Sequence, residues 1–318
     1  MGAKKAINIP YIGNGAYCYA NSTAMLLASI GENVLPSTIE VLSGVGIDTC
    51  LLTKEKLLFF NSVAGAPDIG ISKALETLGF AFTERFSEKP DDNPFEQLGK
   101  ALNESPAVLG PLDMGYLTYN PRHESLYGAD HFILAYEQDK DRVYLHDPAG
   151  FPSVFLSLKD LAQAWKAEDI GYRRGYYRYW INPKRIHRPA EKEVFNRAIQ
   201  FFKSLYNKSR ELAVSDGWVV GRDAIVTVIN RLKNDKVSVN EKAHFIYFAL
   251  PLGAKRALDF ASFFDRYDRR LADLKRQQAE LFGSGHICAI QKDWVGLANI
   301  LENFADTEKK FRNNLLAI

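Results

Sequence analysis

Helical and strand-like patterns of hydrophobic residues alternate over the first half of the chain. A helix is predicted to start at Cys18 and to end at Gly31, because alanine and leucine recur at helical spacing between them. Further helices are expected over residues 69–78, from the capping sequence Asn93-Pro94-Phe95-Glu96, and from Ser157 to Trp165. Strands are expected over residues 107–112, 131–137, 142–147 and 176–181.

Two of these strands form a predicted hairpin around the charged turn at residues 138–141. Odd-numbered positions in both strands are apolar: Ile133, Ala135, Val143 and Leu145. Burial of one apolar face therefore pairs odd positions with odd positions. In that register His131 and Asp147 lie on the same face, near one another at the open end of the hairpin.

The pattern changes after a proline- and arginine-rich segment at residues 182–189, which is typical of a linker. Beyond it, helical periodicity covers approximately residues 190–213, 216–233, 241–267, 269–283 and 293–314. Leu250-Pro251 is expected to kink or divide the third of these helices, and Gly283–His286 to form a turn between two of them. We therefore predict an α+β domain over 1–185 and an α-helical domain over 190–318.

Composition narrows the possible functions. The 318 residues are 47% hydrophobic and 25% charged, as in ordinary globular proteins, and the net charge of +2 gives no reason to expect nucleic acid or membrane as a partner. Neither a secretory signal nor an apolar stretch of membrane-spanning length is evident. The three cysteines are scattered, so neither a disulfide framework nor a metal site is expected. A cytoplasmic protein without a cofactor is the resulting expectation.

Cys18 is the strongest candidate for chemistry. It lies in GNGAYCYANS, where a glycine-rich loop enters a helix, and the positive end of a helix dipole favours a thiolate. A small buried cysteine is the alternative interpretation. Cys50 and Cys288 have no comparable surroundings.

His131 and Asp147 are the natural partners of such a nucleophile. An imidazole can take the thiol proton and return it to a leaving group, and a carboxylate on the next strand can orient the ring. His146 should point to the opposite face, so we reject it as the base. His123, in a loop, is the second candidate for the base.

These residues resemble a known family. A cysteine at a helix start, a histidine opening a strand and a hairpin ending in Asp-Pro are similar to the papain-like fold, and bacteriocin-leader peptidases share this order. More specifically, PAVLGPLDMGYLTYNP followed by GADHFILAYEQDKDRVYLHDPAG resembles the N-terminal domain of the butirosin-biosynthesis acyltransferase family. That family joins this domain to a helical C-terminal domain, so the similarity extends over nearly the whole chain.

The resemblance implies acyl transfer in secondary metabolism, from a carrier-protein or other small acyl thioester through the cysteine to an amine. It places the catalytic roles on Cys18, His131 and Asp147. Asp113 matches the aspartate of the family's Asp–Tyr–Leu-like segment. Asp113 and Tyr116 are expected to bind substrate, with Asp113 holding a cationic amine; a cap or turn role is the alternative for Asp113.

The oxyanion hole departs from the papain pattern. Papain-type enzymes place a glutamine six residues before the cysteine, where this chain has Ile12. The side-chain amide of Asn14 is the expected substitute, with the backbone N–H of Cys18 as the second donor.

Other functions stay open at this stage. A papain-like peptidase or amidohydrolase would use the same residues, and an inactive binding module could retain the fold. The helical domain is expected to cover the cleft and shape the acceptor pocket; a dimerisation or stability module is the alternative, which leaves a homodimer open.

Overall fold

The computed structural model describes residues 9–13 and 16–318, which divide into two compact units. The first unit holds the chain up to Ile39 together with Pro67–Pro189, and the second holds Glu40–Ala66 together with Ala190–Ile318. The predicted boundary near residue 190 is therefore confirmed. The expectation that residues 1–185 form one continuous domain is wrong, because residues 40–66 belong to the helical unit.

The first unit is built on an antiparallel sheet, which confirms the mixed α+β class. In spatial order its described strands are β3 (Phe80–Ser87), β8 (Tyr176–Arg185), β4 (Ala107–Asp113), β5 (Asp130–Gln138), β6 (Arg142–Asp147) and β7 (Phe151–Ser157). Its helices are α1 (Cys18–Ala28), α3 (Pro67–Thr77), α4 (Phe95–Glu104) and α5 (Leu158–Lys166), while α2 (Pro36–Ser43) spans the change between units. The expected helices and strands are all present, whereas α2, β3 and β7 were not foreseen.

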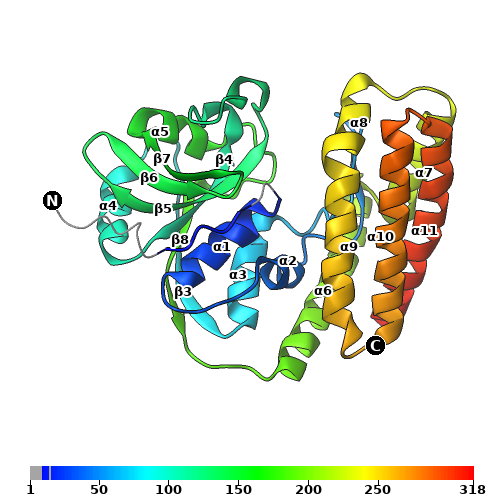
Figure 1. Cartoon of the computed structure of the whole chain (residues 1–318), viewed down its shortest axis with the longest axis horizontal. Helices are drawn as coiled ribbons and strands as arrows, with labels where there is room; N and C mark the ends of the chain where they lie inside the picture. The colour runs from blue at the N-terminus through cyan, green and yellow to red at the C-terminus, as the bar shows by residue number, and fades with distance from the viewer. Residues whose placement is uncertain (1–8, 14–15) are drawn as a thin grey trace. The chain divides into compact units, whose positions relative to one another are not determined.

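Helices cover both faces of this sheet (Figure 1). The odd-numbered face of β5 and β6, including Ile133 and Leu145, packs against apolar residues of α4 and α5. The even-numbered face of β5 contacts α1 through Phe132, whose ring meets that of Tyr19 edge to face at 6.0 Å. The central strands β4 and β5 are therefore buried on both faces.

The hairpin of β5 and β6 has the predicted register at its open end. Leu134 pairs with His146 and Ala135 with Leu145, so odd positions face odd positions there. Between Ala135 and Glu137 the pairing is irregular, and from there to the turn the register is shifted by one residue, so that Glu137 pairs with Tyr144. The open end, where His131 and Asp147 lie, keeps the register that alternation predicted.

The second unit is mainly helical. Its elements are β1 (Cys50–Leu52), β2 (Leu57–Phe59), α6 (Glu191–Ser215), β9 (Val219–Val220), α7 (Gly221–Lys233), α8 (Val239–His244), the π-helical turn η4 (Phe245–Ala249), α9 (Leu250–Asp265), α10 (Arg269–Ile290) and α11 (Trp294–Ala317). The strands form a small antiparallel sheet in the order β2–β1–β9. Pairing of Cys50 with Val220 in that sheet ties residues 40–66 to the C-terminal helices.

A buried polar cluster strengthens this attachment. Glu308 of α11 accepts hydrogen bonds from Tyr206 of α6 at 2.6 Å and from Gln278 of α10 at 2.7 Å. The ammonium of Lys275 lies 3.9 Å from the same carboxylate. Asp48, just before β1, lines the same cavity of about 20 Å³, which has room for about one water molecule. Segment 40–66 makes polar contacts of its own with the helices, because the hydroxyls of Ser62 and Ser209 lie 2.9 Å apart and Arg256 donates to Glu40 at 2.7 Å.

Two sequence expectations in the helical unit have different outcomes. Pro251 lies at the start of α9, directly after the π-helical turn η4. Because proline has no backbone N–H to donate, regular α-helical hydrogen bonding is interrupted here, and η4 separates α8 from α9. The expected turn at Gly283–His286 is wrong, because these residues lie inside α10. A Cβ on Gly285 would approach Leu297 at 3.1 Å, so this glycine permits close packing of α11.

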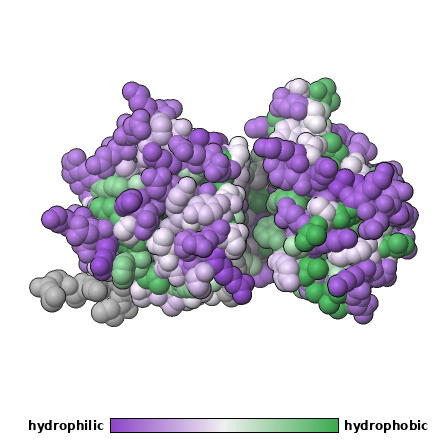
Figure 2. Space-filling view, turned by 90° about the horizontal axis from the view of Figure 1, so that it is seen from above, coloured by the Kyte–Doolittle hydropathy of each residue, from purple (hydrophilic) through white to green (hydrophobic). Residues whose placement is uncertain are grey.

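Hydrophilic and hydrophobic side chains are intermixed on the visible surface of each unit (Figure 2). Exposed hydrophobic side chains of the helical unit include Val239, Tyr247, Ile287 and Val295. Among the described helices, none combines the length and apolar character required to cross a membrane.

Asp48 predicts a pH-dependent stability. Burial, reinforced by the nearby Glu308, raises the pKa of its carboxyl from 3.8 to about 7. The folded chain therefore retains a proton that the unfolded chain releases, and the free energy of unfolding should fall as pH rises from about 4 to 7, by at most roughly 1.4 kcal/mol per pH unit. Asp48→Asn should leave thermal stability at pH 5 nearly unchanged and increase it at pH 8.

The exposed Asp216 offers a matched control, since Asp216→Asn should leave the pH dependence as it is. A destabilisation by Asp48→Asn that is equal at pH 5 and pH 8 would contradict the prediction.

Candidate active site

Cys18 is the first residue of α1 and is partly exposed. The preceding residue, Tyr17, has left-handed backbone geometry with φ of 62°, and its carbonyl accepts a hydrogen bond from the N–H of Asn21 at 2.8 Å. The Asn21 side chain also donates to the carbonyl of Ala16 at 2.5 Å. The chain therefore turns sharply before Cys18, leaving this residue at the positive end of the helix dipole.

The position of α1 on the sheet brings Cys18 to β5. One turn after Cys18, the hydroxyl of Ser22 donates to the backbone carbonyl of Phe132 at 3.2 Å. Tyr19 packs on the ring of the same phenylalanine. Because Phe132 directly follows His131, this contact sets the helix start against the histidine.

His131 and Asp147 meet as predicted. The Nε2 atom of His131 lies 2.6 Å from Oδ1 of Asp147, and the two side chains are 3% and 0% exposed. The imidazole also hydrogen-bonds the Cys18 sulfur, which leaves Nδ1 for this contact. Cysteine, histidine and aspartate thus form one connected row, with the cysteine at its accessible end.

Asp147 is held by more than His131. Its Oδ1 accepts a hydrogen bond from the N–H of Ala149 at 2.7 Å, and its Oδ2 accepts one from the hydroxyl of Tyr119 at 2.8 Å. Tyr11 donates to the Asp147 backbone carbonyl at 2.8 Å and accepts from the N–H of Gly150 at 3.0 Å. These contacts leave the carboxylate little rotational freedom, so it can orient the imidazole.

The loop before Cys18 approaches the turn after Asp147 closely. A Cβ on Gly13 would lie 2.4 Å from the Cα of Pro148, so only glycine fits there without a shift. Glycine at this position therefore allows the loop before α1 to pack directly against the turn after Asp147.

The electrostatics of the row favour an ion pair. Burial alone favours a neutral imidazole, but the Asp147 carboxylate raises the pKa of His131 well above its usual value, and the Cys18 contact acts in the same direction. Burial opposes ionisation of Asp147, yet His131 and the hydrogen bonds from Ala149 and Tyr119 hold the pKa of that carboxyl below its usual value. Each group thereby stabilises the charged form of the other.

The other two histidines considered for the base have structural surroundings. His146 accepts a hydrogen bond from the N–H of Ser153 at 3.0 Å on Nδ1, and burial lowers its pKa, so its ring is neutral. Nδ1 of His123 lies 2.8 Å from the carbonyl oxygen of Gly115, to which it donates. The rejection of His146 as the base is therefore consistent with the register.

The remaining expected site residues have different environments. Asp113 is 1% exposed, and its carboxylate accepts hydrogen bonds from the N–H groups of Gly115 at 2.8 Å and Gly128 at 3.1 Å. This is the cap role weighed for it, and the burial of its carboxylate does not favour the expectation of an amine-binding Asp113. The ring of Tyr116 packs edge to face on Tyr127. Asn14, the expected oxyanion donor, lies outside the described residues.

Sequence reasoning missed Tyr119 and Tyr11. Tyr119 lies in the very segment GPLDMGYLTYNP that pointed to Asp113, but no spacing rule connects it with an aspartate 28 residues later. Tyr11 reaches Asp147 across 136 residues. Such long-range contacts leave no local signal in one sequence.

The fold and the row define an α+β protein with a Cys–His–Asp site. In the described part of the chain, no group of His, Cys, Asp and Glu side chains is arranged to hold a metal ion. The chain is 42% identical over 308 residues to the "Uncharacterized protein YobF" of Bacillus subtilis (strain 168), covering 97% of this chain and 98% of that protein. The family described as YobF C-terminal domain matches residues 215–316, within the helical unit. This chain therefore belongs to the YobF family.

We predict that iodoacetamide near neutral pH modifies Cys18 faster than the other two cysteines. The imidazole of His131 contacts the partly exposed Cys18 sulfur and can take its proton, whereas burial and Asp48 raise the pKa of the Cys50 thiol to about 12. His131→Ala should slow modification of Cys18 by about tenfold or more, and Asp147→Asn by less. Mass mapping of labelled peptides against time measures each rate.

Two controls sharpen this experiment. The rate at Cys288 in the same sample reports global changes, and His187→Ala removes an exposed histidine outside the row. Equal loss of Cys18 reactivity in His187→Ala, or preferential labelling of Cys50 or Cys288, would contradict the prediction.

Proposed function

We propose that the first unit is a papain-like cysteine enzyme that transfers acyl groups from a thioester to an amine. The observation that carries this proposal is the connected row of Cys18, His131 and Asp147, with a partly exposed sulfur at its end. Nucleophile, base and orienting carboxylate in contact are what covalent acyl chemistry requires.

In the first half-reaction, the Cys18 thiolate attacks the carbonyl carbon of the acyl thioester. The carbon–sulfur bond to the donor thiol breaks, and the His131 imidazolium gives its proton to the departing thiolate. The products are an acylated Cys18, a free donor thiol and a neutral imidazole. Asp147 keeps the ring oriented throughout, since its own position is set by Tyr119 and Ala149.

In the second half-reaction, a neutral amine attacks the acyl carbon. The new carbon–nitrogen bond forms, the proton of the amine passes to His131, and Cys18 departs as a thiolate. The ion pair is thereby restored. Negative charge on the carbonyl oxygen in both steps is stabilised by the backbone N–H of Cys18, which as the first residue of α1 has no helical acceptor.

The resemblance to the butirosin-biosynthesis acyltransferases favours an amine over water in the second step. It extends to a carrier-protein thioester as the donor and to secondary metabolism as the setting. An amine outcompetes water only when it is held near the acyl carbon, where proximity can contribute about 7–11 kcal/mol.

The proposal predicts amine-accelerated turnover of an acylated Cys18. The intact protein should be loaded with a simple acyl thioester, and release of the acyl group followed by mass spectrometry with and without a polyamine or aminoglycoside. We expect faster release with amine and a matching amide product. Cys18→Ser should lower loading by at least about a hundredfold, because its hydroxyl is a far weaker nucleophile.

Release at the same rate in water alone, or efficient cleavage of an unstructured peptide, would favour hydrolysis over transfer. Failure of Cys18 to become acylated by any thioester would overturn both.

A further inference from the structure

Asp130 is a carboxylate beside the row that the mechanism above does not use. It is the first residue of β5, directly precedes His131 and is partly exposed. In the sheet it pairs with Asp113, so the two carboxylates belong to the same end of neighbouring strands. Unlike Asp113, which is 1% exposed, Asp130 is accessible to a ligand.

Tyr172 connects Asp130 to the nucleophile. Its hydroxyl donates to Oδ2 of Asp130 at 2.7 Å. The Tyr172 hydroxyl also lies within electrostatic range of the Cys18 sulfur. Burial, and after it the Asp130 carboxylate, raises the pKa of Tyr172 well above its usual value, so the phenol remains a neutral donor. Asp130, Tyr172 and Cys18 are thus grouped at one place.

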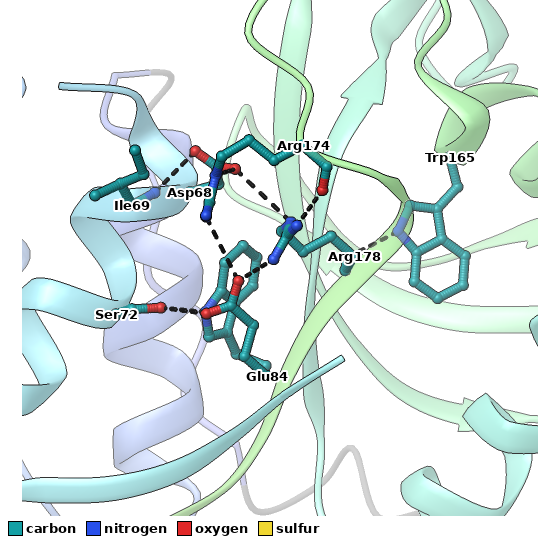
Figure 3. A network of polar contacts seen from close by, with 8 residues as sticks. Asp68, Ile69, Ser72, Glu84, Trp165, Arg174 and Arg178 are labelled. Carbon is teal, nitrogen blue, oxygen red and sulfur yellow. Dashed lines mark hydrogen bonds and ion pairs between the residues drawn. The ribbon is translucent and has the colours of Figure 1, made fainter. Parts of the chain in front are cut away.

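A polar network holds the segment that carries Tyr172 (Figure 3). Nε of Arg174, two residues on, lies 2.8 Å from Oδ2 of the buried Asp68. Arg178 donates to the carbonyl of Arg174 and to Glu84, and the indole of Trp165 donates to the carbonyl of Arg178 at 2.9 Å. These bonds connect the segment to α3, β3 and α5. Tyr172 is therefore positioned by its neighbours as well as by Asp130.

Asp130 differs in its ion pairing from three other carboxylates of this unit, Asp68, Glu84 and Asp147. Asp68 and Glu84 are paired with Arg174 and Arg178, and Asp147 is paired with His131. Among the residues that the structure describes, Asp130 forms no ion pair, and the hydrogen-bond partner found for it is the uncharged Tyr172.

The nearest cation in sequence to Tyr172 is engaged elsewhere. Arg173 lies with its guanidinium 3.9 Å from the ring centre of Tyr176. Asp130 is therefore a partly exposed carboxylate without an ion-pair partner among the described side chains, and a bound cation would stabilise its charge.

We infer that Asp130, oriented by Tyr172, binds the ammonium group of a cationic amine acceptor and brings it to acylated Cys18. This assignment rests on the acyl-transfer function proposed above and replaces Asp113 as the acceptor-binding residue. A polyamine or amino sugar has the required chemistry, because one ammonium group can pair with Asp130 while a second amino group, after losing its proton to solvent, attacks the acyl carbon. The proton released from the attacking nitrogen then passes to His131.

The test compares acceptors of different charge. With Cys18 acylated by a simple thioester, the ratio of kcat/KM for spermidine to that for hydroxylamine, which is uncharged near neutral pH, measures recognition of an ammonium group. Asp130→Asn should lower this ratio about 10- to 100-fold, as expected for loss of a charge-assisted hydrogen bond. Asp130→Glu should retain most of the ratio, and Tyr172→Phe should lower it less than Asp130→Asn.

Asp169 provides the matched control, since it is an exposed carboxylate in the same part of the unit, near Gly128. Asp169→Asn should leave the ratio unchanged. An unchanged ratio in Asp130→Asn, with amine-accelerated turnover intact in the unmodified protein, would overturn this assignment and leave acyl transfer in place. An equal decrease of the ratio in Asp130→Glu and in Asp130→Asn would also overturn it, because recognition of the amine would then depend on the shape of the side chain and not on its charge. Absence of amine acceleration in the unmodified protein would overturn acyl transfer itself and the assignment with it.

Discussion

The register of the hairpin formed by β5 and β6 is the constraint on which the candidate site depends. A slip of one residue would exchange the two faces of a strand, placing His146 where Asp147 lies and sending Ile133 and Ala135 out of the core. The apolar face that packs on α4 and α5 therefore does two things at once. It stabilises the unit, and it fixes the only pairing in which His131 and Asp147 can meet at 2.6 Å.

Cys18 reaches this pair by a separate interaction. The contacts of Ser22 and Tyr19 with Phe132 hold α1 on the even-numbered face of β5. The same short stretch of β5 therefore positions both the candidate nucleophile and the candidate base. Rigid elements thus carry both groups, and the left-handed turn at Tyr17 supplies the abrupt entry to the helix. Preorganisation of this kind is what makes a weak nucleophile useful.

Carboxylates in the two units differ in use because their partners differ. Asp147 faces an imidazole and backbone or phenolic donors, Asp113 faces backbone N–H groups, and Asp130 faces a phenol. In the helical unit, Asp48 is buried near another carboxylate, Glu308, and its proton is retained to an unusually high pH. The residue type is the same in each case, and the neighbours decide how each carboxylate is held and whether it keeps its proton.

Much of this molecule was evident from local patterns. Alternation along residues 131–147 and the helical periodicity after residue 190 are local properties, and the loop entering a helix at Cys18 is visible in a dozen residues. The predicted elements and the meeting of His131 with Asp147 therefore followed from the sequence, whereas α2, β3 and β7 did not. The turn expected at Gly283–His286 failed because glycine at Gly285 serves packing against Leu297, a role that local reasoning cannot distinguish from chain reversal.

What only the tertiary structure decided are the contacts between residues far apart in the chain. Residues 40–66 join the helical unit through strand pairing and a polar cluster whose members come from four separate segments. Tyr11 and Tyr119 reach Asp147, and Tyr172 reaches Asp130, over separations from 28 to 136 residues. Periodicity reports which side of an element is buried, but it does not report which distant side chain is buried against it. The sequence by itself therefore determined most of the elements and the candidate nucleophile, base and orienting acid, whereas the folded chain determined which distant side chains hold them.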